Sequence, residues 1–234
     1  MGTISSENNL RGKSYIAFFD LDDTLIRANS GKLLARSAYK QGMMSLQDLI
    51  KALWLLLLYK LSLLDSEKII AVMVKWLAGV PEKRVSDLSS ELFEKHLCPK
   101  ITEEARSEIR FHKDKNAAVV ILSSALFQIC QAAAGHLGMD DIICTNIETD
   151  GGICTGRTAG KPCFGNEKVS RLKEYCEKNN SKVADAWYYG DSISDLPVLK
   201  IVGNPVCVNP DKNLLKAANK NKWKICSWIN IHNK

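Results

Sequence analysis

An uninterrupted apolar run near the N-terminus ends directly in a cluster of acidic side chains. Residues 15 to 19 read YIAFF, and Asp20, Asp22 and Asp23 follow immediately. An apolar, aromatic-rich run of this length predicts a central strand of a parallel sheet, which is covered on both faces. Carboxylates crowded at the end of such a strand repel one another and lose hydration, so the sequence predicts a compensating positive charge beside them.

Strand-like and helix-like segments alternate from residue 117 onward. The predicted strands cover 117–122, 141–146, 186–190, 205–209 and 223–228, and the predicted helices cover 126–137, 166–178, 194–202 and 211–220, with a Gly-rich hairpin around 150–152. This alternation predicts an α/β fold with right-handed crossovers and a doubly wound, Rossmann-like parallel sheet. In such a sheet the functional crevice lies outside the carboxyl ends of the strands.

The segment between the first two predicted strands lacks any strand pattern and is rich in Leu, Lys, Ala and Glu. It predicts several helices, which we interpret as a helical cap inserted into the α/β core. The predicted core comprises residues 1–28 and 114–234, and the predicted cap comprises residues 29–113. A chain of 234 residues with 46% hydrophobic content is large enough for one core and a modest second unit.

Charge and cysteine content narrow the classes of function. The 32 basic and 26 acidic residues are interspersed, which favours an anionic small-molecule ligand and argues against a nucleic-acid partner that needs a concentrated basic stripe. The eight cysteines are scattered without a CxxC pair, and the N-terminus lacks the apolar stretch of a signal peptide. We therefore expect free thiols and a cytoplasmic location. Oligomeric state stays open.

Three of the predicted strands deliver polar side chains to one edge of the sheet. Asp20 and Asp22 follow the first strand, Ser123 follows the second, and Asp191 follows the strand at 186–190. A hard divalent cation, expected to be Mg2+, takes oxygen ligands and offsets the repulsion between the carboxylates.

The motifs at these strand ends resemble those of a known enzyme superfamily. FFDLDDTLI, residues 18–26, resembles the DxDxT signature of haloacid dehalogenase superfamily phosphotransferases, and YYGDSISDLPVL, residues 188–199, resembles their acidic fourth motif. The position of the helical insert and the stretch VGNPVCVNPDKNL, residues 202–214, resemble subfamily IB, the phosphoserine-phosphatase-like group. The resemblance implies a Mg2+-dependent phosphomonoester hydrolase that acts on a small phosphorylated metabolite or a lipid headgroup phosphate.

The resemblance also implies roles for the acidic residues. Asp20 would attack phosphorus and form an aspartyl-phosphate, which divides the hydrolysis into two steps. Asp22 would protonate the leaving alkoxide and then take a proton from the attacking water. The implied Mg2+ ligands are Asp20, Asp191 and the backbone carbonyl of Asp22, and the implied supporting residues are Thr24, Gly190 and Asp195.

Phosphate binding is assigned by the same resemblance. Ser123 and the backbone N–H of Ser124 would hold phosphoryl oxygens at the N-terminus of the following helix, where the helix dipole favours anions. Lys168 would balance the charge of the transferring group, because the family places its lysine in a G-x-x-K stretch at the start of this helix. Lys161 is the alternative lysine.

Simpler roles stay open for several of these residues. Asp23 fits a turn position, Ser123 and Ser124 could cap a helix, and Asp195 could cap the helix that follows it. The alternative function is a non-catalytic or regulatory Mg2+-binding module recruited to membranes, although such a module does not need the second carboxylate at Asp22.

Two features bear on substrate and location. The apolar segment at residues 49–65 has an uninterrupted part too short to span a bilayer, so it predicts a buried cap helix. The alternative is a cap face that touches a membrane through this segment, with Lys51, Lys60 and Lys68 near anionic headgroups. Asn29 stands nine positions after Asp20, where phosphoserine phosphatases carry a Glu for the substrate's amino group, so we expect poor activity on phosphoserine.

Overall fold

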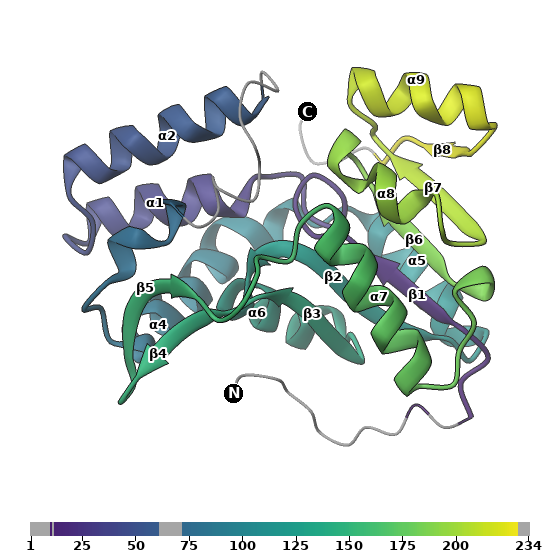
Figure 1. Cartoon of the computed structure of the whole chain (residues 1–234), viewed down its shortest axis with the longest axis horizontal. Coiled ribbons are helices and arrows are strands. Elements are labelled where there is room, and N and C mark those ends of the chain that lie inside the picture. The colour runs from purple at the N-terminus through teal and green to yellow at the C-terminus, as the bar shows by residue number, and fades with distance from the viewer. Residues whose placement is uncertain (1–9, 11, 61–71, 229–234) are drawn as a thin grey trace.

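The computed structural model describes residue 10 and residues 12–60 and 72–228, and its central feature is a parallel sheet with helices on both faces (Figure 1). Within these residues the sheet has six strands in the order β3-β2-β1-β6-β7-β8, and every neighbouring pair is parallel. The strands are β1 (Ile16–Phe19), β2 (Ala118–Leu126), β3 (Asp141–Thr145), β6 (Trp187–Gly190), β7 (Asn204–Val208) and β8 (Lys224–Cys226). The predicted fold class is confirmed.

Alternate residues of β1 enter two separate apolar clusters, which explains why the whole strand is apolar. Ile16 and Phe18 lie in a cluster with α7, α8 and α9, whereas Ala17 and Phe19 lie in a cluster with α5 and α6. These helices are α5 (Glu103–Asp114), α6 (Phe127–Leu137), α7 (Asn166–Lys178), α8 (Leu196–Leu199) and α9 (Lys212–Asn221). All four β1 side chains are therefore fully removed from water.

The described residues between β1 and α5 form helices joined by turns, as the sequence predicted. They contain α1 (Ser30–Lys40), α2 (Leu46–Lys60), η1 (Lys75–Leu77), α4 (Glu82–Leu92), η2 (Phe93–Leu97) and η3 (Cys98–Lys100). Leu34 of α1 and Leu92 of α4 belong to the same apolar cluster as Phe19, so the cap and one face of the sheet share a continuous core. α5, at the end of the predicted cap 29–113, also packs against β2 of the predicted core. The domain boundary itself stays a prediction.

A β-hairpin beyond the sheet pairs with the cap. The hairpin consists of β4 (Ile147–Asp150) and β5 (Ile153–Thr158), and its turn lies at the Gly-rich position that the sequence indicated. The backbone N–H of Cys154 donates to the carbonyl of Val80 at 2.9 Å, and the N–H of Gly79 donates to the carbonyl of Cys154 at 2.9 Å. The hairpin is thus tied to the cap by backbone hydrogen bonds.

The strongly apolar segment is only partly buried. Leu49 and Ala52 of α2 are buried, but Leu46, Ile50 and Trp54 are 53%, 59% and 57% exposed. The prediction of a buried helix is wrong for this face, because α1 packs against one side of α2 and α2 lies at the periphery of the molecule (Figure 1). Residues 61–65 of the segment, and Lys68, lie outside the described residues. None of the described helices combines the length and apolar character that a bilayer crossing requires.

A buried histidine lies within the aromatic layer on one face of the sheet. The ring nitrogens of His112 lie 2.9 Å from the Tyr15 hydroxyl and 2.8 Å from the Tyr189 hydroxyl, and Tyr189 donates to Glu108 at 2.6 Å. Since the Tyr189 proton points to Glu108, Nε2 of His112 donates to Tyr189 and Nδ1 accepts from Tyr15. This pattern satisfies a neutral imidazole, and burial lowers the pKa of His112 to about 4.

We expect His112 to make folding stability depend on pH between 6.5 and about 4. In this window the unfolded chain binds a proton at His112 that the folded protein does not, so the free energy of unfolding falls as pH decreases. Replacing His112→Gln should remove up to about 3 kcal/mol of this pH-dependent change, measured by urea unfolding across the window. The exposed His96→Gln serves as the control, and equal slopes in wild type and His112→Gln would contradict the assignment.

Candidate active site

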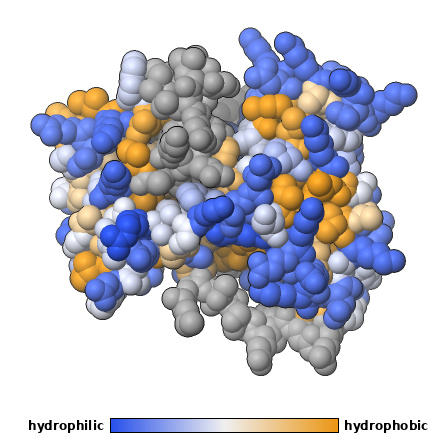
Figure 2. Space-filling view, in the orientation of Figure 1, coloured by the Kyte–Doolittle hydropathy of each residue, from blue (hydrophilic) through white to orange (hydrophobic). Residues whose placement is uncertain are grey.

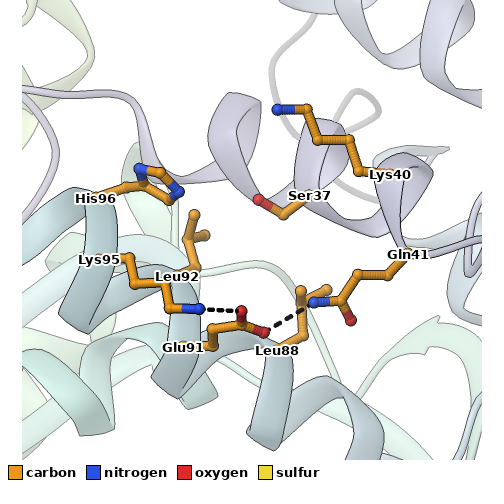
Figure 3. A pocket seen from close by; sticks show the side chains of 8 residues that line it. All are labelled: Ser37, Lys40, Gln41, Leu88, Glu91, Leu92, Lys95 and His96. Carbon is orange, nitrogen blue, oxygen red and sulfur yellow. Dashed lines mark hydrogen bonds and ion pairs between the residues drawn. The ribbon is translucent and has the colours of Figure 1, made fainter.

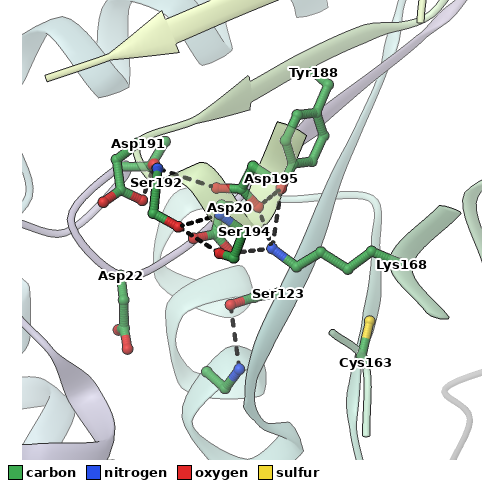
Figure 4. A network of polar contacts seen from close by, with 12 residues as sticks. Asp20, Asp22, Ser123, Cys163, Lys168, Tyr188, Asp191, Ser192, Ser194 and Asp195 are labelled. Carbon is green, nitrogen blue, oxygen red and sulfur yellow. Dashed lines mark hydrogen bonds and ion pairs between the residues drawn. The ribbon is translucent and has the colours of Figure 1, made fainter. Parts of the chain in front are cut away.

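Carboxylates from two neighbouring strand ends meet at one edge of the sheet (Figure 4). Asp20 follows β1 and Asp191 follows β6. In the sheet β1 lies between β2 and β6; the chain adds β2 and β3 on one side of β1 and then β6, β7 and β8 on the other, so the site lies where the strand order reverses. Single carboxylate oxygens of Asp20, Asp191 and Asp195 lie within 4.8 Å of one another. Of the predicted acidic residues, these three are brought together.

A buried lysine bridges two of these carboxylates. Nζ of Lys168, on the first turn of α7, donates to Oδ1 of Asp20 at 2.9 Å, to Oδ1 of Asp195 at 2.8 Å, and to the Tyr188 hydroxyl at 3.0 Å. The alternative, Lys161, is exposed, and its backbone carbonyl accepts from Arg171. The geometry therefore favours Lys168 as the lysine that faces the acidic cluster.

The three carboxylates outnumber the single ammonium group. Burial raises the pKa of Asp20 to about 6, although Lys168 opposes this shift. Burial also raises the pKa of Asp191 well above its usual range, and Asp195 and Asp20 add to the effect. Burial lowers the pKa of Lys168, but Asp195 and Asp20 outweigh it and raise the value overall. This excess of buried negative charge, on oxygen atoms alone, fits a hard divalent cation such as Mg2+.

Asp22 lies apart from this cluster. Its carboxylate accepts from the backbone N–H and the hydroxyl of Ser30, both at 3.0 Å, at the first residue of α1. In Figure 4 its side chain points away from that of Asp191. Burial raises the pKa of Asp22 to about 7, although the bonds from Ser30 oppose the shift. Asp22 thus links the β1 loop to the cap, and burial moves the pKa of its carboxyl toward neutrality.

Ser123 faces the cluster from within a strand. β2 continues to Leu126 because it keeps pairing with β3 there, so the strand is longer than predicted and α6 begins at Phe127 with no side-chain cap. Ser123 is buried, its hydroxyl lowers the pKa of Asp20 against the larger effect of burial, and it accepts from the N–H of Ala125 at 3.3 Å. Neither Ser123 nor Ser124 caps the helix, which removes that simpler role.

The predicted supporting residues lie where they constrain the carboxylates. Thr24 donates to Oδ1 of Asp191 at 3.4 Å. A Cβ on Gly190 would lie 2.7 Å from Oδ2 of Asp195, so this close approach requires glycine. The Asp195 side chain does not cap α8, since it accepts from Lys168, Tyr188 and Ser192 instead. Asp23 has a φ of 56°, typical of a turn residue.

Sequence reasoning missed Tyr188, Ser30 and Ser192. Tyr188 donates to Asp195 at 2.6 Å. Nothing in the sequence indicated this bond, because an aromatic residue in an apolar strand is typical of the hydrophobic core. Ser192 and Asp195 form a capping box, and their S-x-x-D spacing is a sequence signal that could have located Ser192. No sequence signal links Ser30 to Asp22, because that contact depends on where α1 packs.

A hollow lies in the cap between α1 and α4, away from the acidic cluster (Figure 3). Its volume is about 130 Å3, and it is lined by Ser37, Lys40, Gln41, Leu88, Glu91, Leu92, Lys95 and His96. Its single carboxylate, on Glu91, is already bonded by Lys95 and Gln41. The hollow shares no residue with the acidic cluster, so the sheet edge is the candidate active site.

The model of the haloacid dehalogenase-like hydrolase family matches residues 17–200, a range that contains every member of the acidic cluster. The chain belongs to this family.

Relatives within the family are named as phosphatases. The chain is 28% identical over 215 residues to a probable phosphatase of Mycobacterium tuberculosis, covering 91% of this chain and 75% of that protein. It is 26% identical over 218 residues to a histidinol-phosphatase of Neisseria meningitidis serogroup C, covering 91% of this chain and 98% of that one. The predictions of the family and of an enzyme of the haloacid dehalogenase phosphatase type are confirmed.

The fold is similar to a solved phosphoserine phosphatase. That structure, described as a phospho-aspartyl intermediate analogue, matches with a TM-score of 0.70 and 20% identity, covering 93% of this chain and 95% of that chain. The match confirms the α/β core together with its helical cap as a haloacid dehalogenase-like architecture.

We expect Lys168→Met to lower both activity and stability. Loss of the ammonium leaves the buried carboxylates of Asp20 and Asp195 unpaired, which should reduce the free energy of unfolding by about 3–5 kcal/mol. Urea unfolding at neutral pH in EDTA measures this change, and phosphate release measures activity. Lys161→Met is the matched control and should retain both properties; a larger loss in Lys161→Met would reverse the choice of lysine.

Proposed function

We propose that the chain is a Mg2+-dependent phosphatase that hydrolyses small phosphomonoesters through an aspartyl-phosphate on Asp20. The observation that carries this proposal is the position of the Asp20 carboxylate, at the end of β1 and in contact with the buried cation Lys168. Family membership and the phosphatase relatives support the same reaction class. A carboxylate nucleophile splits one difficult hydrolysis into two easier displacements.

Mg2+ would be held by Asp20, Asp191 and the backbone carbonyl of Asp22. When bound, it would neutralise charge on the phosphoryl oxygens and so permit an anionic nucleophile to approach an anionic substrate. Thr24 would keep the Asp191 carboxylate in place through its hydrogen bond. Asp195 would act as a positioning residue, because it orients Lys168 and abuts Gly190.

The chain's own groups would handle the charge and the protons. Lys168, which donates to Asp20, and the buried Ser123 hydroxyl would bind the oxygens of the transferring phosphoryl group. Asp22 would give its proton to the leaving alkoxide oxygen and then accept one from the water that attacks the aspartyl-phosphate. Its raised pKa suits both transfers near neutral pH. Because Asp22 is bonded to Ser30 of α1, the position of this acid would depend on the cap.

Asp20→Asn should reduce phosphate release from p-nitrophenyl phosphate to below about 1% of wild type, since an amide cannot form the acyl phosphate. Asp23→Asn is the matched control, because it also removes one carboxylate from the same loop and Asn tolerates the positive φ. EDTA should abolish wild-type turnover, and added Mg2+ should restore it. Turnover retained by Asp20→Asn would remove Asp20 from the nucleophile role.

The substrate of the proposed enzyme is a small phosphorylated molecule other than phosphoserine. The side-chain oxygen of Asn29 accepts from the N–H of Lys32 at 2.8 Å and so caps α1. The amide oxygen is therefore engaged by the helix, and the side chain has no charge to pair with an ammonium group.

A cytoplasmic location belongs to the same proposal, and it is supported by the eight cysteines, all of which are free thiols.

We expect phosphoserine to be a poor substrate, with kcat/KM at least about tenfold below that of the best compound in a panel of phosphomonoesters. Asn29→Asp keeps a good helix cap and adds a carboxylate, so it should raise activity on phosphoserine relative to p-nitrophenyl phosphate. Phosphate release under identical conditions measures both ratios. Phosphoserine ranking first with the wild type would overturn this assignment of specificity.

A further inference from the structure

One face of α2 carries an apolar stripe that the described structure leaves in solvent. Leu46, Ile50 and Trp54 recur every four residues, so their side chains are neighbours on the helix surface, and each is more than half exposed. With Tyr39 of α1, they make up half of the large apolar side chains that are exposed among the described residues; the others are Phe111, Ile153, Leu215 and Ile225. The stripe is therefore a concentration of exposed apolar side chains on the α1–α2 hairpin.

Rotation of α2 about its axis would not bury the stripe without exposing side chains that are now buried. Leu49 and Ala52 already pack in the core cluster that includes Leu34 and Ala35 of α1. An amphipathic surface helix normally exposes polar side chains and buries its apolar ones, so a second, exposed apolar stripe is unusual. α2 lies on the outer side of α1, away from the sheet (Figure 1), and Figure 2 shows apolar surface beside hydrophilic side chains in that region, at the upper left. The apolar face is thus available to a partner outside the chain.

The charge around the stripe selects the kind of partner. Residues 30–60 contain five basic residues and one acidic residue, Asp48, whose carboxylate accepts from Ser45 at 2.6 Å. Lys40 and Lys51 are exposed at this hairpin. A second copy of the chain would bring like charges together, which is unfavourable. An anionic bilayer surface offers both an apolar layer and negative headgroups.

We propose that the α1–α2 hairpin docks on the surface of an anionic lipid bilayer. Leu46, Ile50 and Trp54 enter the headgroup region, where the amphipathic indole ring is favoured, and Lys40 and Lys51 lie against the lipid phosphates. The contact is peripheral, since no described helix is suited to cross the membrane. The proposal does not depend on the phosphatase reaction, because it uses the outer side of the cap and none of the acidic cluster.

Vesicle flotation with the full chain tests this docking. The wild type should float with phosphatidylcholine vesicles that contain about a quarter phosphatidylglycerol, and it should stay at the bottom with pure phosphatidylcholine. Ile50→Glu should lower the partition coefficient about tenfold, because it places a carboxylate in the apolar stripe. The matched control is Leu215→Glu, at an exposed apolar position on α9, which should float like the wild type.

Lys51→Glu keeps the test valid if Ile50→Glu proves unstable, since an exposed lysine can be replaced without loss of packing. It should weaken flotation about threefold to tenfold, whereas Lys216→Glu on α9 should not. Three results would overturn the proposal: a wild type that never floats with anionic vesicles, equal losses in Ile50→Glu and Leu215→Glu, or a wild-type dimer that Ile50→Glu converts to monomer. The last result would identify a second copy as the partner.

Discussion

A buried ammonium group between two carboxylates is the interaction on which the candidate active site depends. Lys168 joins Asp20, at the end of β1, to Asp195, in the turn after β6, and Tyr188 bonds to both Lys168 and Asp195. Each of these charges would be strongly unfavourable alone in a buried position. Paired, they fix two strand ends relative to the first turn of α7. The geometry of the nucleophile candidate therefore depends on residues far apart in the chain.

The same interaction leaves a charge imbalance that explains the chemistry of the site. One ammonium faces three carboxylates; burial raises the pKa values of Asp20 and Asp191, and the neighbouring carboxylates add to the rise. Protonation would relieve the excess at low pH, and a divalent cation would relieve it near neutrality. The proposed Mg2+ would therefore offset the repulsion between these carboxylates as well as the charge on the transferring phosphoryl group. Asp22, bonded to Ser30 in the cap, is kept separate from this cluster.

Local sequence patterns predicted where the strands lie, but they did not predict how far every helix is buried. Most predicted elements after residue 117 agree with the structure to within a few residues, since each apolar run matches the burial of its strand or helix. β2 ends four residues later than predicted, at Leu126, because its pairing with β3 continues past a register shift. α2 was expected to be buried, yet Ile50 and Trp54 are exposed. The hydrophobicity of a side chain shows that burial would stabilise it, but whether it is buried depends on which elements pack against its helix.

The sequence by itself determined that Asp20, Ser123 and Asp191 share one edge of the sheet. The carboxyl ends of parallel strands lie on the same side, so Asp20 and Asp191, which directly follow β1 and β6, converge with Ser123 in the second half of β2. Only the tertiary structure decided that Lys168 rather than Lys161 reaches the carboxylates, that Tyr188 joins them, and that α2 keeps an apolar face in solvent. These outcomes depend on how α7 and α2 pack against the rest of the chain, and residue order along the chain does not specify that packing.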